Sequence, residues 1–153
     1  MCSSDLTGPL AYLGRFPEQQ VVQPAESSWG ARGDASTWIA PAGDWMYRHL
    51  HVAARRMAAA AEAHPGATGL ARRALQQAAR ELLLAQSSDW AFILHTGAAP
   101  AYAARRFRGH VAAVLGLLDG LQAGTVDEVW LSELEGRNNL FPGIDPGVYR
   151  PCP

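Results

Sequence analysis

The chain is predicted to fold as an all-α bundle of about four to five helices, with irregular arms at both ends. Several segments carry apolar residues at three- and four-residue steps, which is the period of a helix packed on a core. Pro, Gly and Ser gather between and outside these segments, where they favour turns and loops. With 153 residues, 48% of them hydrophobic, the chain is long enough to bury a core as one domain.

The N-terminal arm is expected over residues 7–41, which are rich in Pro, Gly, Ser and Gln and show no sustained period. Residues 1–6 (MCSSDL) resemble the translation of a sequencing adapter fused to a read end, and we interpret them as an artefact. A disordered native terminus is the alternative. If they are an artefact, the natural sequence begins near Thr7, and the reading frame was cut there.

The bundle is expected over residues 42–137, and its first helix runs from an N-cap at Asp44 to about residue 63. Its apolar stripe comprises Trp45, Met46, Leu50, Ala53, Met57 and Ala60. The sequence His64-Pro65-Gly66 then ends the helix, because proline disfavours helical backbone at the preceding residue and glycine tolerates the turn.

A second helix is expected over residues 69–86, and a short helical segment over residues 90–95. The apolar face of the second helix comprises Leu70, Ala74, Ala78, Leu82 and Ala85. Its solvent face is expected to comprise Arg72, Arg73, Gln76, Gln77 and Arg80. Glu81 lies within an apolar stretch, and a salt bridge to an arginine is expected to accommodate it.

Two further helices complete the predicted bundle. In the first, Pro100 occupies a position that an initial helical turn tolerates. Its apolar seam comprises Phe107, Val111, Val114, Leu118 and Leu121. Thr125 and Glu128 have the spacing of a capping box, which predicts a last helix over residues 126–135. The C-terminal tail, residues 138–153, is expected to pack on the bundle through Phe141, Ile144 and Tyr149.

Charge and composition exclude several classes of function. The net charge is −1 and all thirteen basic residues are arginine, so no basic footprint for nucleic acid or an anionic membrane is present. No apolar run reaches the roughly 18 residues that a membrane span needs. Cys2 and Cys152 lie at the two ends and form no disulfide framework. His49 and His51 point to different faces of a helix, so we expect no metal site and no cofactor.

Three of the five tryptophans, Trp29, Trp38 and Trp90, lie in loop-like or helix-end positions outside apolar stripes. Such indoles are candidates for stacking on a flat ligand such as a sugar ring. For Trp29 and Trp38, anchoring of the loop onto the helices is the role that the residues alone favour. Asp89 lies at a helix break beside Trp90, where it could cap the next helix, bind a ligand, or do both. Core packing is expected for the remaining tryptophans, Trp45 and Trp130.

Four stretches carry a family resemblance, namely ESSWG with Trp38 downstream, DWMYRHLHVAARRM, RELLLAQSSDWAFILHTG and ELEGRNNLFPGIDPGVYR. Together they resemble the C-terminal helical domain of glycoside hydrolase family 57, in particular its 1,4-α-glucan branching enzymes. The resemblance runs from about residue 8 to residue 150. It implies a cytoplasmic protein of glycogen biosynthesis that acts on α-1,4-glucans such as glycogen or amylose. Such an enzyme transfers a glucan segment to a glucan 6-hydroxyl by a retaining mechanism.

The resemblance also implies roles for single residues. Trp29 matches the stacking tryptophan of the family's SWG motif, and Trp38 matches its second indole. Asp89 matches the aspartate of the SDW motif, which contacts sugar hydroxyls, and Trp90 is its neighbour. One position departs from the family: Ala98 stands where members often have a polar residue that contacts sugar.

No catalytic residue is assigned to this chain. In the family, a glutamate nucleophile and an aspartate acid/base lie on an incomplete barrel that precedes the helical domain, and nothing here matches their motifs. The chain therefore looks like a detached C-terminal part, inactive alone, whose partner is the barrel of the same polypeptide. Two alternatives stay open: a stand-alone α-glucan-binding or interaction module, and the helical domain of another family 57 amylase or glucanotransferase.

Overall fold

The structure, a computed structural model, describes residues 6–30 and 32–150, and within them the predicted all-α fold is confirmed. The α-helices are α1 (Pro9–Arg15), α2 (Trp45–Ala63), α3 (Gly69–Ala85), α4 (Asp89–Thr96), α5 (Pro100–Ala123) and α6 (Glu128–Arg137). Two short 3-10 helices are η1 (Ala35–Thr37) and η2 (Pro146–Tyr149). The adapter-like residues 1–5 and the two cysteines lie outside the described residues.

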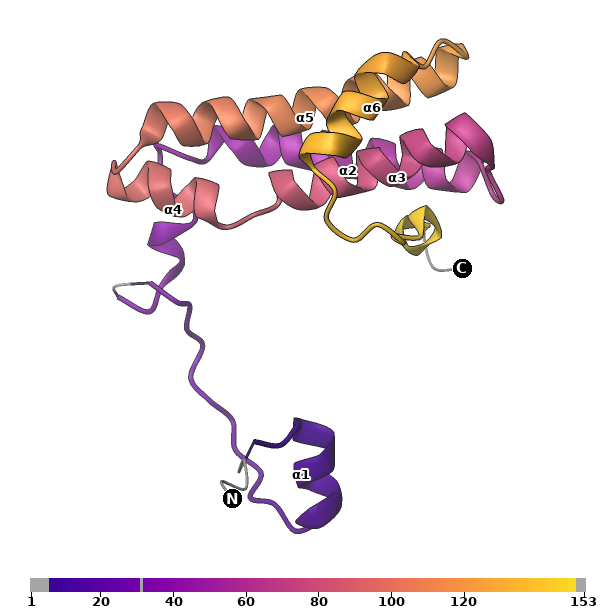
Figure 1. Cartoon of the computed structure of the whole chain (residues 1–153). Coiled ribbons are helices and arrows are strands. Elements are labelled where there is room, and N and C mark those ends of the chain that lie inside the picture. The colour runs from indigo at the N-terminus through magenta and orange to yellow at the C-terminus, as the bar shows by residue number, and fades with distance from the viewer. Residues whose placement is uncertain (1–5, 31, 151–153) are drawn as a thin grey trace, which may run out of the picture.

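The bundle is organised around α5, the longest helix, which packs along α2, α3 and α4 (Figure 1). Pro100 lies in the first turn of α5, as predicted. Gly97 and Gly124 adopt the left-handed conformation that ends α4 and α5, with φ of 70° and 69°. Asp44 is the N-cap residue of α2, as predicted, but its side chain makes no capping hydrogen bond.

Two apolar clusters share the interior. The first joins α2, α3, α5 and α6, and its largest fully buried members are Met57, Leu75, Leu82, Leu117 and Leu131. The second joins the start of α2 to α4 and the first half of α5, through Met46, Trp90, Leu94, Phe107 and Val111. Leu50 and Leu115 contact both clusters. Trp45 and Trp130 pack against the clusters, which confirms their predicted core role.

Part of the predicted solvent face of α3 is buried. Gln77 and Arg80 were expected to face solvent, and both expectations are wrong. The chain after α6 covers them: Arg80 donates to the carbonyl oxygens of Leu140 and Pro142 at 3.0 and 2.8 Å. Gln77 donates to the carbonyl oxygen of Asn138 at 3.2 Å. The arginine and the glutamine therefore supply the hydrogen bonds that this irregular backbone needs when it packs on a helix.

Glu81 is also buried, with 1% of its surface exposed, and its predicted partner was wrong. Its Oε2 accepts from Nδ1 of His110 at 2.6 Å rather than from an arginine. Its Oε1 accepts from the side-chain amides of Asn138 and Gln77, at 2.8 and 2.9 Å. Burial raises the pKa of Glu81, but the three hydrogen bonds outweigh burial and hold that pKa below its ordinary value.

The start of α6 differs from the predicted capping box. Thr125 donates its backbone N–H to the carbonyl oxygen of Gly120 at 2.8 Å, and so belongs to the end of α5. The N-cap of α6 is Asp127, whose Oδ1 accepts from the backbone N–H of Trp130 at 3.0 Å. The helix therefore begins two residues later than predicted.

Asp127→Ala is expected to lower the free energy of unfolding by about 1 kcal/mol, because it removes the acceptor for an otherwise unpaired helical N–H. Thr125→Ala serves as the control and should cost less than about half of that, since the Thr125 side chain caps no helix. Urea denaturation of both variants measures the difference. A larger loss for Thr125→Ala would contradict this assignment of the cap.

The two arms differ in how they pack. α1 lies in the stretch expected to be irregular, buries no residue and stands apart from the bundle (Figure 1). In the C-terminal tail, Ile144 and Tyr149 pack on the first cluster, as predicted. The expectation for Phe141 is wrong: its φ is +47° and its side chain is exposed. It lies at the turn that directs the neighbouring carbonyl groups towards Arg80.

Candidate functional site

The loop made by residues 28–30 and 32–38 is closed by its own hydrogen bonds. The backbone N–H of Ser28 donates to the carbonyl oxygen of Gly33 at 2.7 Å, and the Ser28 hydroxyl donates to the carbonyl oxygen of Asp34. The Asp34 carboxylate accepts from the backbone N–H of Ser36 at 3.0 Å and caps η1. Hydrogen bonding to Ser36 holds the pKa of Asp34 below its ordinary value, so the cap stays ionised near neutral pH.

Gly30 lets this loop close. A Cβ at this position would lie 2.8 Å from Oγ1 of the buried Thr37 and 3.2 Å from the carbonyl oxygen of Asp34. Any other residue would push the two sides of the loop apart. The glycine of the SWG sequence therefore fixes the path of the backbone beside Trp29.

The loop presents an aromatic surface, which we call the aromatic shelf and define as Trp29, Trp38 and Phe92. The Trp29 ring lies 6.3 Å from the ring of Trp38 and 5.9 Å from the ring of Phe92 on α4, measured between centroids. Trp29 nevertheless keeps 77% of its surface exposed. Trp38 is half-buried, and its carbonyl oxygen accepts from the Tyr47 hydroxyl at 2.7 Å. Loop anchoring and ligand stacking were the two roles predicted for these tryptophans. Trp38 anchors the loop, whereas Trp29 faces solvent.

A hollow of about 520 Å³ opens beside the shelf. Trp29 and Phe92 contribute apolar wall, and Ser28, His95 and Thr96 contribute polar groups. This combination suits a ligand with both apolar faces and hydroxyl groups. Sequence reasoning missed Phe92, His95 and Thr96. Their three- and four-residue spacing on α4, directly after Asp89, was the signal that could have found them.

The other two predicted residues lie at the start of α4. Asp89 is exposed, and its Oδ2 accepts from the Ser87 hydroxyl at 2.6 Å. It is the first residue of the helix, and the N-cap is Ser88, so the capping role expected of Asp89 is wrong. Trp90 is buried, and its indole N–H donates to the carbonyl oxygen of Leu84 at 2.7 Å. Its ring also lines a smaller cavity of about 220 Å³ together with Trp38.

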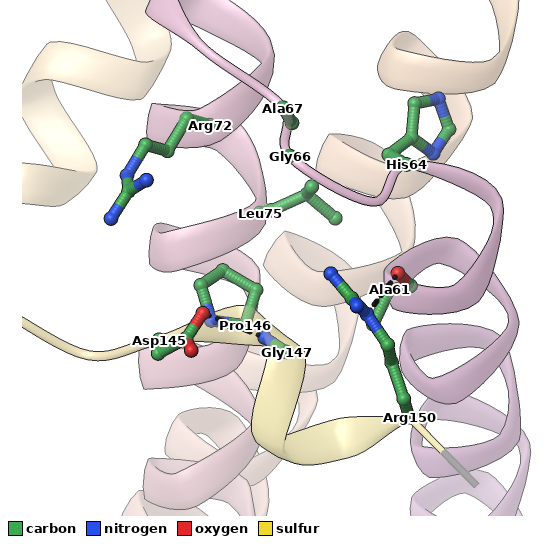
Figure 2. A pocket seen from close by; sticks show the side chains of 10 residues that line it. All are labelled: Ala61, His64, Gly66, Ala67, Arg72, Leu75, Asp145, Pro146, Gly147 and Arg150. Atoms are coloured by element: carbon green, nitrogen blue, oxygen red, sulfur yellow. Dashed lines mark hydrogen bonds between the residues drawn. The ribbon is translucent and has the colours of Figure 1, made fainter.

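A separate small pocket, about 120 Å³, lies between η2 and the turn that joins α2 to α3 (Figure 2). Arg150 reaches across it and donates to the carbonyl oxygen of Ala61 at 3.2 Å (Figure 2). Arg72 and Asp145 also line it. None of the four predicted site residues lines this pocket. The hydrogen bond from Arg150 to Ala61 fastens the C-terminal tail to α2.

Two further findings concern the part of the chain that the structure describes. No group of three or more His, Cys, Asp or Glu side chains there is arranged to hold a metal ion. None of the helices there has both the length and the apolar character needed to cross a membrane.

Comparison with known proteins decides the family. The family model for the C-terminal region of 1,4-alpha-glucan branching enzymes matches residues 49–149, which is most of the chain. This chain belongs to that family. The match extends from α2 to η2 and so includes α4, which carries Phe92 and Asp89.

The similar proteins include branching enzymes and an alpha-amylase. A 1,4-alpha-glucan branching enzyme of Thermococcus kodakarensis is 37% identical over 136 residues, which cover 86% of this chain and 20% of that protein. A crystal structure of a GH57-type branching enzyme from Pyrococcus horikoshii superposes with a TM-score of 0.82 and 34% identity, covering 95% of this chain and 28% of that one. An alpha-amylase, AmyC from Thermotoga maritima, gives a TM-score of 0.75 and 36% identity, covering 99% and 28%.

The chain thus corresponds to the C-terminal helical domain of these branching enzymes. It spans about a fifth of the length of the curated relative and 28% of each solved structure. The aromatic shelf is therefore a feature of one domain within a much longer architecture.

Proposed function

We propose that this chain is the C-terminal domain of a 1,4-α-glucan branching enzyme and that its aromatic shelf contacts the glucan. The observation that carries the proposal is the exposed Trp29 indole, held against Trp38 and Phe92 by a hydrogen-bonded loop. A rigid exposed indole is suited to stack on a sugar ring, and it loses little conformational freedom when the sugar binds. We propose glycogen and amylose as the glucans and the cytoplasm as the site of action, with no cofactor.

Catalysis is proposed to take place elsewhere in the full polypeptide. Retaining transfer requires a carboxylate nucleophile and a separate acid/base on opposite sides of one sugar bond. Glu81 cannot serve, because its oxygens are occupied by His110, Gln77 and Asn138 inside the core. Asp89 is accessible, but it stands at the helix start as a single carboxylate beside Ser87. We therefore expect this chain to be inactive on its own.

The proposed contribution of the domain is to hold the glucan and to limit the access of water to the reacting sugar. A glucosyl-enzyme intermediate must persist until a glucan 6-hydroxyl arrives, so aromatic walls that exclude water favour transfer over hydrolysis. Trp29 would supply the stacking surface and Asp89 would accept hydrogen bonds from sugar hydroxyls. Trp38 and Trp90 would act from beneath, because Trp38 supports Trp29 and buried Trp90 fixes the start of α4.

Trp29→Ala in the full-length enzyme is expected to lower branching activity on amylose about fivefold to tenfold, since it removes about 1 kcal/mol or more of stacking. The ratio of hydrolysis to transfer should rise at the same time. Counting the α-1,6 branch points formed, alongside the reducing ends released, measures both. Val129→Ala on α6 is the control, because it removes an equally exposed apolar side chain outside the shelf.

Unchanged branching and hydrolysis in Trp29→Ala would reject the shelf as a glucan contact. The stand-alone module is tested separately by titrating the isolated chain with malto-oligosaccharide and following tryptophan emission. Saturable binding that Trp29→Ala abolishes would favour the module over a domain that completes its site with the rest of the polypeptide.

A second candidate is the helical domain of an amylase with the same fold, favoured by the similarity to the alpha-amylase of Thermotoga maritima. Product analysis of the full enzyme separates the two activities. A branching enzyme creates α-1,6 linkages in amylose, whereas an amylase shortens the chains without creating branches.

A further inference from the structure

A further cavity, about 370 Å³ in volume, lies between α5 and α6, away from the aromatic shelf. Its lining includes Arg105, Arg106, Gly109, His110, Arg137 and Asn138. Three arginine residues thus line one hollow of a protein whose net charge is −1. Such a concentration of arginine has an electrostatic cost unless something anionic offsets it.

Positive charge exceeds negative charge in the lining of this cavity. Among the described residues, no carboxylate forms an ion pair with any of its three arginines. Glu81 is the one carboxylate in its lining, and His110, Gln77 and Asn138 occupy its oxygens. The hollow therefore keeps an excess of positive charge.

Two buried polar atoms of the cavity residues also have no hydrogen-bond partner among the described residues: Nε of Arg106 and Nε2 of His110. Only 3% of the His110 surface is exposed. Its Nδ1 already forms a hydrogen bond with the Glu81 carboxylate. Buried polar atoms are almost always paired, so these two atoms need a partner that the described residues do not supply. Arg106 Nε is a donor, whereas Nε2 accepts from a hydroxyl when the imidazole is neutral and donates when it is protonated.

Gly109 lies in the exposed part of the cavity wall. It lies in the middle of α5, where glycine costs about 1 kcal/mol relative to alanine. A Cβ at this position would meet no atom within 4 Å, so helix packing does not require glycine here. It lines the cavity between Arg105 and Arg106 on one side and His110 on the other. A larger side chain would occupy the space that a ligand needs.

We propose that this cavity binds a phosphate group, either as inorganic phosphate or as the phosphate of a phosphorylated sugar. A phosphate monoester offers several acceptor oxygens for the guanidinium groups and, when protonated, one hydroxyl for His110. Arginine forks match phosphate geometry with paired hydrogen bonds. The cavity is larger than phosphate alone requires, which leaves room for a sugar ring attached to the phosphate.

The test is isothermal titration calorimetry on the full chain, purified without phosphate or sulfate. Inorganic phosphate, glucose 6-phosphate, glucose 1-phosphate and unphosphorylated glucose are titrated separately. We expect saturable binding of the phosphate-bearing compounds and none of glucose at this cavity. Tighter binding of a sugar phosphate than of phosphate would identify the ester as the ligand, and equal binding would identify phosphate itself.

Two variants locate the site. Arg106→Gln should weaken phosphate binding about tenfold or more, because it removes a charge-assisted hydrogen bond. Gly109→Leu should abolish binding by filling the cavity, while the circular dichroism spectrum remains that of the wild type. Arg55→Gln on α2 removes the same charge elsewhere and should leave binding unchanged.

Absence of phosphate binding to the wild-type chain would overturn the proposal. So would binding that persists in both Arg106→Gln and Gly109→Leu, or that falls equally in Arg55→Gln. The outcome is independent of the aromatic shelf, because Trp29→Ala leaves this cavity intact.

Discussion

Replacing Glu81 with leucine is expected to lower the free energy of unfolding by about 3–5 kcal/mol, because it leaves several buried or half-buried donors without an acceptor. The change would leave Nδ1 of His110 and the amides of Gln77 and Asn138 without their shared acceptor. Each lost partner is buried or half-buried, so water cannot replace the carboxylate cheaply. Urea denaturation at neutral pH measures the loss.

The pH dependence of stability tests the charge of Glu81 separately. Because its folded-state pKa is depressed below the ordinary value of 4.5, the ionised carboxylate stabilises the fold fully above that value. This contribution is lost as the pH falls through the folded-state pKa. Glu81→Gln keeps the shape and removes the titration, so its stability should fall less steeply than that of the wild type below about pH 4.5.

Glu133→Gln is the matched control, because it removes an exposed carboxylate from α6. It should reproduce the acid sensitivity of the wild type. Parallel stability curves for wild type and Glu81→Gln would show that the buried carboxylate contributes nothing to acid unfolding. Such curves would contradict the hydrogen-bonded arrangement described above.

Phe107→Ala is the second change with a large expected effect, about 3–5 kcal/mol of lost unfolding free energy. Phe107 has 1% of its surface exposed and is one of the largest fully buried side chains. Its ring meets Trp45 edge-on, with centroids 5.5 Å apart and an interplanar angle of 89°. Truncation would therefore leave a cavity in the second cluster and remove an aromatic contact. Thermal and urea unfolding both report the loss.

Phe141→Ala is the control for this substitution, since it deletes the same ring from an exposed turn. A change within about 0.5 kcal/mol is expected for this surface position. Comparable losses in the two variants would mean that the ring of Phe107 is not the packing element that its burial indicates.

Helix positions were predictable because apolar spacing and Gly/Pro punctuation are local signals. α2 and α5 end within two residues of Pro65 and Gly124. α3 ends one residue before the predicted end at Gln86. The burial of Gln77 and Arg80 was not predictable, because the segment that covers them is about 60 residues away in the sequence. Helical periodicity reports which face is polar, but not whether another segment supplies hydrogen bonds to that face.

The candidate site shows a similar division. Trp29 and Trp38 could be selected from their loop context, and the structure brings them together. Phe92 escaped notice because a phenylalanine in an apolar helical segment has the same local pattern as a core residue. Trp90 does belong to the core, although its position at a helix break resembled that of a binding residue. Residue type and local context cannot separate these cases, because the separation depends on which helix face meets the loop.

The contacts of the C-terminal tail determine when, during protein synthesis, this domain can complete its fold. The polar groups of α3 acquire their partners from residues 138–144, and Arg150 closes on Ala61. Because the chain leaves the ribosome from its N-terminus, these residues emerge after α2 to α5, which can begin to fold first. During that interval the nascent helices present a carboxylate and a guanidinium on what becomes an interior surface. Completion of the domain therefore waits for residues 138–150, and a chain that stalls before residue 138 would present an unfinished surface to chaperones and proteases.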